Sequence, residues 1–268
     1  MSKNPFFSLI FIGTMLLISY GSPQLIANNI TDAQTMLEDI HANRNNDGAL
    51  SKLLPIVRGS FQSNKCETLL MTKLRDVNTT MQEFRKTANI LAGLLAAKVM
   101  DNLPTKHAEI KTPIANYTGL QLANNINLLS VMRSGDALLE EFEKFFPQAP
   151  INKVLVQRNE LTAEPDFKYM KLSPALGPNS YVIITEPMLA TGGTLGMVLN
   201  LLKERGVQEE NVIIACVCTA PEGLLVLNHK FPKINVVMIT MDDHLNERKY
   251  IVPGIGDFGD RYFGTVHQ

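Results

Sequence analysis

The chain has 268 residues, of which 45% are hydrophobic and 19% are charged, as in a globular protein with one α/β domain and additional segments. Its formal net charge of −1 gives no field that attracts a polyanion, so we expect no nucleic-acid partner. The odd, sparse set of three cysteines argues against a disulfide framework, and no CxxC or Cys/His cluster indicates zinc.

The N-terminus carries an almost continuous apolar run over residues 6–18, followed by small residues. The run is shorter than the roughly 20 residues that span a bilayer, and it has the length of the apolar region of a signal peptide. We therefore interpret residues 1–21 as a hydrophobic leader, either signal-like or an anchor. The alternatives to a leader are a wrongly assigned start of the chain and a buried segment. If residues 6–18 are not cleaved, they would provide any contact with a membrane.

Residues 22–63 are predicted to be a variable N-terminal extension. Thr31 and Asp32 can cap a short helix that runs to His41, and residues 49–57 can form a second short helix. Near residue 64 the sequence changes character, and a capping box at residues 80–83 opens a long amphipathic helix. We therefore divide the chain into 1–21, 22–63 and a main domain over 64–268.

Two predicted strands, residues 126–131 and 153–157, are each followed by an arginine, Arg133 and Arg158. A residue at the carboxyl end of a strand in an open α/β sheet points toward the ligand crevice. The planar fork of arginine suits a diphosphate there, although either arginine alone would be read as a surface salt-bridge residue.

The segment 164–174 is aromatic and alternating, and we interpret it as an extended arm that serves as a lid or a subunit contact. Residues 211–219 and 235–240 are predicted strands, and Cys216 and Cys218 are interpreted as buried residues of the first. Asp242, Asp243 and His244 follow the second strand. Adjacent residues on a loop rarely converge on one ion, so we interpret them as solvated charges.

A strand over residues 181–185 is followed by an acid and a loop of mostly small residues, and then by a helix from Leu195. Such a loop offers amide N–H groups and the positive end of the helix dipole to a phosphate. The loop has no Gly-Lys-Ser/Thr ending, so it is not an ATP-type phosphate loop. Its acid could accept hydrogen bonds from ribose hydroxyls while the loop holds a 5′-phosphate. The predicted sugar-phosphate site comprises Glu186, Pro187, Met188, Leu189, Ala190, Thr191, Gly192, Gly193 and Thr194.

The tail over residues 250–265 has four glycines and one proline, so its backbone can approach a ligand closely. Together with VMRSG, QRNELTAEP and EPMLATGGT, this tail resembles the uracil phosphoribosyltransferases among the type I phosphoribosyltransferases. The resemblance covers roughly residues 65–266. It implies an α/β fold in which a parallel five-stranded sheet is flanked by helices and covered by a hood subdomain.

The same resemblance implies an enzyme of pyrimidine salvage that makes UMP and diphosphate from uracil and phosphoribosyl diphosphate (PRPP). Carried over by position, Arg133, Arg158 and Asp257 would be the catalytic residues and would bind PRPP together with residues 186–194. Ile251, Gly256, Asp257 and Phe258 would frame uracil. Mg²⁺ would be the cofactor and would be carried by PRPP. A homodimer or higher homo-oligomer and a purine nucleotide activator are the other expected partners.

The chain departs from the family at Glu186, where Asp is usual, at Thr194, where Ser is usual, and at Asn159, where Asp is common. One extra methylene can displace an acceptor by an amount that matters to catalysis. We therefore keep as alternatives a weak or inactive regulatory protein that binds a nucleotide or PRPP, and a transferase for another pyrimidine-like base. Substrate supply favours the cytoplasm, whereas the leader favours targeting, export or anchoring.

Overall fold

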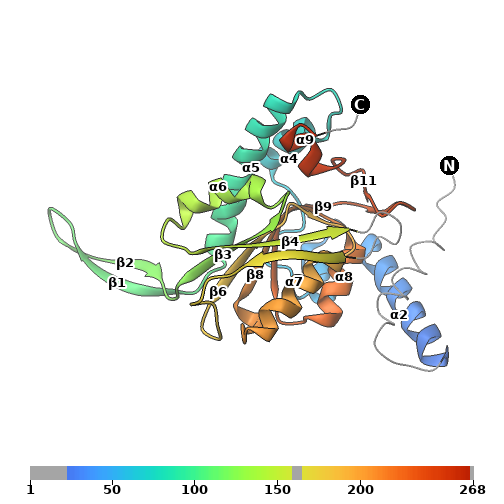
Figure 1. Cartoon of the computed structure of the whole chain (residues 1–268), viewed down its shortest axis with the longest axis horizontal. Coiled ribbons are helices and arrows are strands. Elements are labelled where there is room, and N and C mark those ends of the chain that lie inside the picture. Colours follow the sequence, from blue (N-terminus) through green and yellow to red (C-terminus); the bar gives the residue numbers. More distant parts are fainter. Residues whose placement is uncertain (1–22, 159–164, 266–268) are drawn as a thin grey trace.

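The computed structural model describes residues 23–158 and 165–265, and it has a central sheet with helices on both faces (Figure 1). The strand order is β5-β4-β3-β6-β8-β7, and β9 also pairs with β8. Five long strands are mutually parallel, namely β3 (Ile126–Met132), β4 (Ile151–Arg158), β6 (Tyr181–Thr185), β8 (Val212–Thr219) and β9 (Asn235–Met241), and the two-residue strand β7 is parallel to them. The predicted sheet of five parallel strands is therefore confirmed, and two further strands extend it.

The first additional strand, β5 (Pro165–Lys171), pairs antiparallel with β4 and forms an edge of the sheet. The predicted extended arm over residues 164–174 is extended in β5, but its pairing with the sheet was not foreseen. Its role as a lid or a subunit contact stays a prediction. The second, β7 (Met188–Leu189), pairs with Cys218 and Thr219 at the end of β8. A stretch of the predicted phosphate loop is thus anchored to the sheet.

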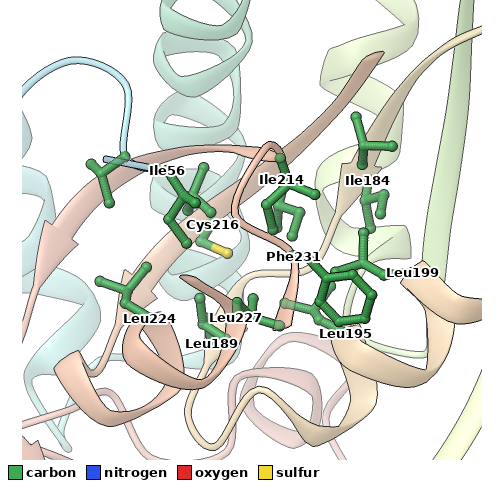
Figure 2. Packing of buried hydrophobic residues seen from close by; sticks show 14 of the residues in the cluster. Ile56, Ile184, Leu189, Leu195, Leu199, Ile214, Cys216, Leu224, Leu227 and Phe231 are labelled. Carbon is green, nitrogen blue, oxygen red and sulfur yellow. The ribbon is translucent and has the colours of Figure 1, made fainter. Parts of the chain in front are cut away.

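The central strands β3, β6, β8 and β9 are buried on both faces, which explains their continuous apolar sequences. One face is covered by α4 (Lys65–Arg75), α5 (Met81–Asp101), α6 (Asp136–Phe145) and α9 (Phe258–Phe263). The other face is covered by α2 (Pro23–Ala42), α3 (Asp47–Leu53), α7 (Gly193–Glu204) and α8 (Pro221–Lys230). The 3₁₀ turn Glu209–Asn211 leads into β8. Figure 2 shows part of the second core, where Leu195 and Leu199 of α7 and Leu224 and Leu227 of α8 share a cluster with Cys216.

The extension before residue 64 is packed into this second core. Ile40, Leu50 and Phe61 are almost fully buried, and Ile56 belongs to the cluster of Figure 2. Residues 56–58 run along the outer edge of β9, where Arg58 N donates to Val236 O and Val236 N donates to Ile56 O. The first helix was predicted to begin at residues 31–32, but α2 begins earlier, at Pro23. The division at residue 64 remains a prediction, and the leader over 1–21 lies outside the described residues.

The ribbon of β1 (Thr105–Lys111) and β2 (Asn116–Leu122) projects away from the sheet (Figure 1). Only an extended segment before Pro113 was foreseen here, because β2 is too polar for its pattern to stand out. None of the helices in the described ranges is long and apolar enough to cross a bilayer.

The chain after β9 forms the hood over the carboxyl ends of the strands, with β10 (His244–Leu245) paired to β11 (Ile251–Val252). A buried ion pair fixes it: Arg75 donates to both oxygens of Asp242, at 2.6 and 2.8 Å. Gly254 is held from both sides, because its N–H donates to Asp242 and its carbonyl accepts from Arg75, each at 2.8 Å. The prediction that Asp242 is solvated is wrong: the residue is 3% exposed.

Burial alone would raise the pKa of Asp242, but the hydrogen bonds and charge of Arg75, with the Gly254 N–H, lower the pKa overall. A group whose pKa is lower in the folded protein stabilises the fold above its unfolded-state pKa, which is about 3.9 for Asp. That stabilisation is lost as the pH falls through the folded-state pKa.

We predict that Asp242→Asn lowers the free energy of unfolding by about 3 kcal/mol near neutral pH, because it leaves Arg75 without its counter-charge. The difference from wild type should shrink below about pH 4, where the wild-type carboxylate also becomes protonated. Urea denaturation at both pH values measures this. Asp243→Asn is the control, since its half-exposed side chain should contribute less than about 1 kcal/mol. Equal effects of the two variants at neutral pH would contradict the prediction.

Candidate functional site

A cleft of about 1350 Å³ lies at the carboxyl ends of the parallel strands, where ligands of open α/β sheets bind. Four segments that are distant in sequence line it: residues 131–134 at the end of β3, residues 155–157 of β4, residues 186 and 188–195 after β6, and residues 246, 249–253, 256–260 and 265 in the hood. The structure therefore brings together three of the four sequence motifs and Gln157, the first residue of the fourth.

The loop after β6 is built for close approach of a ligand to the backbone. Gly192 has φ +77° and caps α7, so the orphan N–H groups of that helix face the loop. Gly223 lets α8 pack against the loop, since a Cβ there would lie 2.3 Å from Ala190 O. Every predicted phosphate-loop residue except Pro187 lines the cleft. Pro187 has an anchoring position instead, because its carbonyl accepts hydrogen bonds from Val217 N and Cys218 N.

Glu186 is 8% exposed and stands at the junction of two of these segments. Its Oε1 accepts a hydrogen bond from Ser134 Oγ at 3.0 Å and one from Met188 N at 3.4 Å. Ser134 was not singled out from the sequence, because only the fold brings the two residues together. The extra methylene of Glu186 relative to aspartate is thus used to reach the loop after β3.

The loop after β3 carries Arg133, whose side chain is half-exposed at the cleft. Its guanidinium contacts Asp260 at 2.5 Å and lies over the ring of Phe263, both in α9. The Met132–Arg133 peptide bond is cis. Gly135 is required here, since a Cβ would lie 2.2 Å from Thr185 O. The second predicted arginine, Arg158, ends β4, but its side chain lies outside the described part of the chain, as does Asn159.

The hood contributes the predicted base-binding residues. Ile251, Gly256, Asp257 and Phe258 all line the cleft. Asp257 caps α9 by accepting a hydrogen bond from Asp260 N at 2.8 Å. The Phe258 ring is buried edge-to-face against Phe84, with the ring centroids 5.2 Å apart. What this segment presents to a base is therefore mostly backbone.

Arg261 fixes the hood segment to α4 and the turn after it. Its guanidinium donates to three backbone carbonyls, those of Leu74, Asp76 and Ile255, at 2.5 to 2.7 Å. Burial lowers its pKa slightly from the usual arginine value, and the charge of Asp76 opposes that change. The sequence offered no signal for this role, since an arginine that binds carbonyls from another segment has no local pattern.

Two buried thiols lie on β8, next to the loop after β6. Burial, followed by the charge of Glu186, raises the pKa of the Cys216 thiol, and burial, followed by Asp242, raises that of Cys218. Both cysteines are fully buried, as predicted. Among the residues that the structure describes, no group of three His, Cys, Asp or Glu side chains is placed to hold a metal ion.

Comparison with known proteins gives a consistent result. The family model described as uracil phosphoribosyltransferase matches residues 61–265. The chain is 37% identical over 196 residues to a uracil phosphoribosyltransferase of Limosilactobacillus reuteri, covering 73% of this chain and 92% of that one. It is 38% identical over 197 residues to that of Dictyostelium discoideum, covering 73% and 91%. The solved structure of the AQ2163 protein from Aquifex aeolicus superposes with a TM-score of 0.71 at 28% identity, covering 79% of this chain and all of that one.

The matched region contains the sheet, the loop after β6, the loop after β3 and the hood, which are the parts that build the cleft. The chain therefore belongs to the uracil phosphoribosyltransferase family.

Proposed function

We propose that this protein is the pyrimidine-salvage enzyme that transfers the phosphoribosyl group of PRPP to uracil, giving UMP and diphosphate. The observation that carries the proposal is the meeting, in one cleft, of a phosphate loop, an arginine loop and a glycine-rich backbone segment. These three parts match the 5′-phosphoribose, the diphosphate and a small planar base.

The phosphoribose end of the substrate fits the loop after β6. The 5′-phosphate would accept hydrogen bonds from the first N–H groups of α7, where the helix dipole also favours negative charge. The hydroxyl groups of Thr191 and Thr194 line the same part of the cleft. Glu186, fixed by Ser134, would accept hydrogen bonds from the ribose hydroxyls.

The diphosphate would lie at Arg133. Its guanidinium forms an ion pair with Asp260 in the structure. A diphosphate carries more negative charge than one carboxylate, so it can compete for the arginine fork. As the bond to the ribose carbon breaks, charge develops on the departing oxygen. A preorganised cation there stabilises the transition state more than the ground state.

Uracil would lie against the hood segment around Ile251 and Gly256. The ring presents donor and acceptor edges that backbone N–H and C=O groups can read without a charged side chain. The left-handed backbone at Gly256 (φ +80°) and at Gly254 (φ +66°) shapes that surface. A hood that covers the bound base would also limit hydrolysis of PRPP.

Mg²⁺ fits this site as an ion that enters with PRPP. Mg²⁺ commonly binds substrate phosphates together with one or two carboxylates, and Asp257 and Asp260 line the cleft next to Arg133. Bound there, the ion would neutralise diphosphate charge. An assay with and without EDTA tests the requirement, and addition of a purine nucleoside triphosphate tests the expected activator.

A homodimer is the oligomer that we propose. The β1–β2 ribbon exposes Ile110, Tyr117 and Leu120, each more than half exposed, and Ile114 at 95%. Ile110 and Tyr117 are cross-strand partners on one face of a ribbon that stands away from the rest of the protein. Such an apolar projection is suited to packing against a second copy of the chain.

The first prediction of this proposal is turnover. The purified protein should form UMP from uracil, PRPP and Mg²⁺. It should form no product with cytosine, because cytosine has an amino donor where uracil has a carbonyl acceptor. Chromatographic detection of UMP measures it. The absence of turnover, with PRPP or UMP still raising the melting temperature, would instead support the non-catalytic binder.

The second prediction concerns Glu186. Because its length is used to reach Ser134, Glu186→Asp should withdraw the carboxylate by about 1 Å and lower kcat/KM for PRPP by about tenfold. Steady-state kinetics with PRPP varied measures this. Ser134→Ala, which removes the same hydrogen bond and keeps the glutamate, should have a smaller effect in the same direction. A gain in activity for Glu186→Asp would show that the longer side chain costs activity.

The third prediction concerns the ribbon. Tyr117→Asp places a charge on the apolar face and should shift the protein from dimer to monomer, measured by light scattering after gel filtration. Asn116→Asp is the control, since it adds the same charge on the opposite face next to Lys111. Unchanged mass for Tyr117→Asp, or a monomeric wild type, would contradict the assignment of the interface.

A further inference from the structure

The extension that precedes the family-matched region contacts the end of β9 that carries Asp242. His41 Nε2 lies 2.7 Å from Asp243 O, and Arg44 Nη2 donates to Met241 O at 3.2 Å. Arg44 also forms an ion pair with the Asp243 side chain. Because a carbonyl only accepts hydrogen bonds, His41 donates in its contact. The two residues that flank Asp242 are therefore held by residues of the extension.

The same three-residue stretch is bonded on its other side to the hood. Asp243 N donates to Val252 O at 2.9 Å, and Asp242 accepts from Gly254 N. His244 and Leu245 then pair with Val252 and Ile251. A continuous set of hydrogen bonds thus runs from the extension through residues 241–245 to the segment that lines the base end of the cleft.

The extension can serve as a firm support because it is buried next to these contacts. Ile40, beside His41, is 1% exposed, and Met241 belongs to the same hydrophobic cluster. Phe61 O accepts from Met241 N, and Gln62 Nε2 donates to Arg44 O at 2.7 Å. Arg44 is therefore fixed at its backbone as well as at its guanidinium.

We propose that His41 and Arg44 are positioning residues that hold the base-binding segment 251–256 in its productive conformation, and so set the affinity for uracil without touching it. The proposal rests on the function proposed above. If residues 241–243 become more mobile, Gly254 and Ile251 at the base end should become more mobile with them. The phosphate loop between β6 and α7 should not change.

A merely structural role of the extension would give a different result, and the chain offers a matched control. Arg58 is also an extension arginine, and its Nε donates to Asn235 Oδ1 at 2.6 Å. Asn235 begins β9, so this contact lies at the end of the strand opposite to Met241. If the extension only covers the edge of β9, Arg44→Met and Arg58→Met should have similar effects.

The experiment compares Arg44→Met, His41→Leu, Arg44→Lys and Arg58→Met in the full chain. Arg44→Met should raise KM for uracil roughly threefold to tenfold, with kcat and KM for PRPP changed less than about twofold. His41→Leu should act in the same direction, Arg44→Lys should restore part of the loss, and Arg58→Met should leave KM for uracil unchanged. Hydrogen exchange of peptides over residues 249–258 should become faster in Arg44→Met than in Arg58→Met.

The exchange measurement does not depend on turnover, so the inference and the proposed function fail separately. A wild type that makes no UMP would overturn the proposed function, and the exchange rates would still test the coupling. Equal exchange over residues 249–258 in Arg44→Met and Arg58→Met would overturn the inference. So would a rise in KM for PRPP as large as that for uracil.

Discussion

The buried pair of Arg75 and Asp242 is the interaction on which the base end of the cleft depends. A charge taken out of water is tolerated only when its partners satisfy it fully, and here both oxygens of Asp242 are bonded. The geometry of the pair therefore specifies where Gly254 must lie. Because Gly254 has a left-handed backbone and a Cβ on it would meet Ile251 O at 2.1 Å, the hood segment has little freedom once the pair has formed.

The phosphate end of the cleft is built differently, from residues close together in sequence. The strand, the acid, the glycine loop and the helix that follow one another over residues 181–204 form a single unit. Its chemistry comes from helix dipole and backbone N–H groups, which any strand–loop–helix of this composition provides. This explains why the sequence was sufficient to predict that unit and its ligand class, and why five strands could be predicted from their apolar runs. Their arrangement as a parallel sheet was implied by the family resemblance.

What the sequence did not reveal depends on contacts between distant segments. Ser134 and Glu186 are 52 positions apart and Arg75 and Asp242 are 167 apart, so no local pattern relates them. Asp242 was misread for this reason, since an acid next to another acid and a histidine is typical of an exposed loop. Likewise the pairing of β5 with the sheet was not foreseen, because an edge strand and an exposed extended segment have the same alternating pattern. The burial of the Phe258 ring against Phe84 likewise joins two distant segments, and no local pattern indicates it.

The PRPP end and the uracil end of the cleft are therefore built in different ways. The residues of the phosphoribose end are consecutive in sequence and are held by the neighbouring strand β8, whereas the base end is set by contacts with α4, β9 and the extension. Substitutions remote from the cleft should therefore act on the base more readily than on PRPP. Glu186 adds a contact with another segment of the cleft, because it accepts a hydrogen bond from Ser134 in the loop after β3. A change there affects the local unit directly, while changes at the extension reach only the hood.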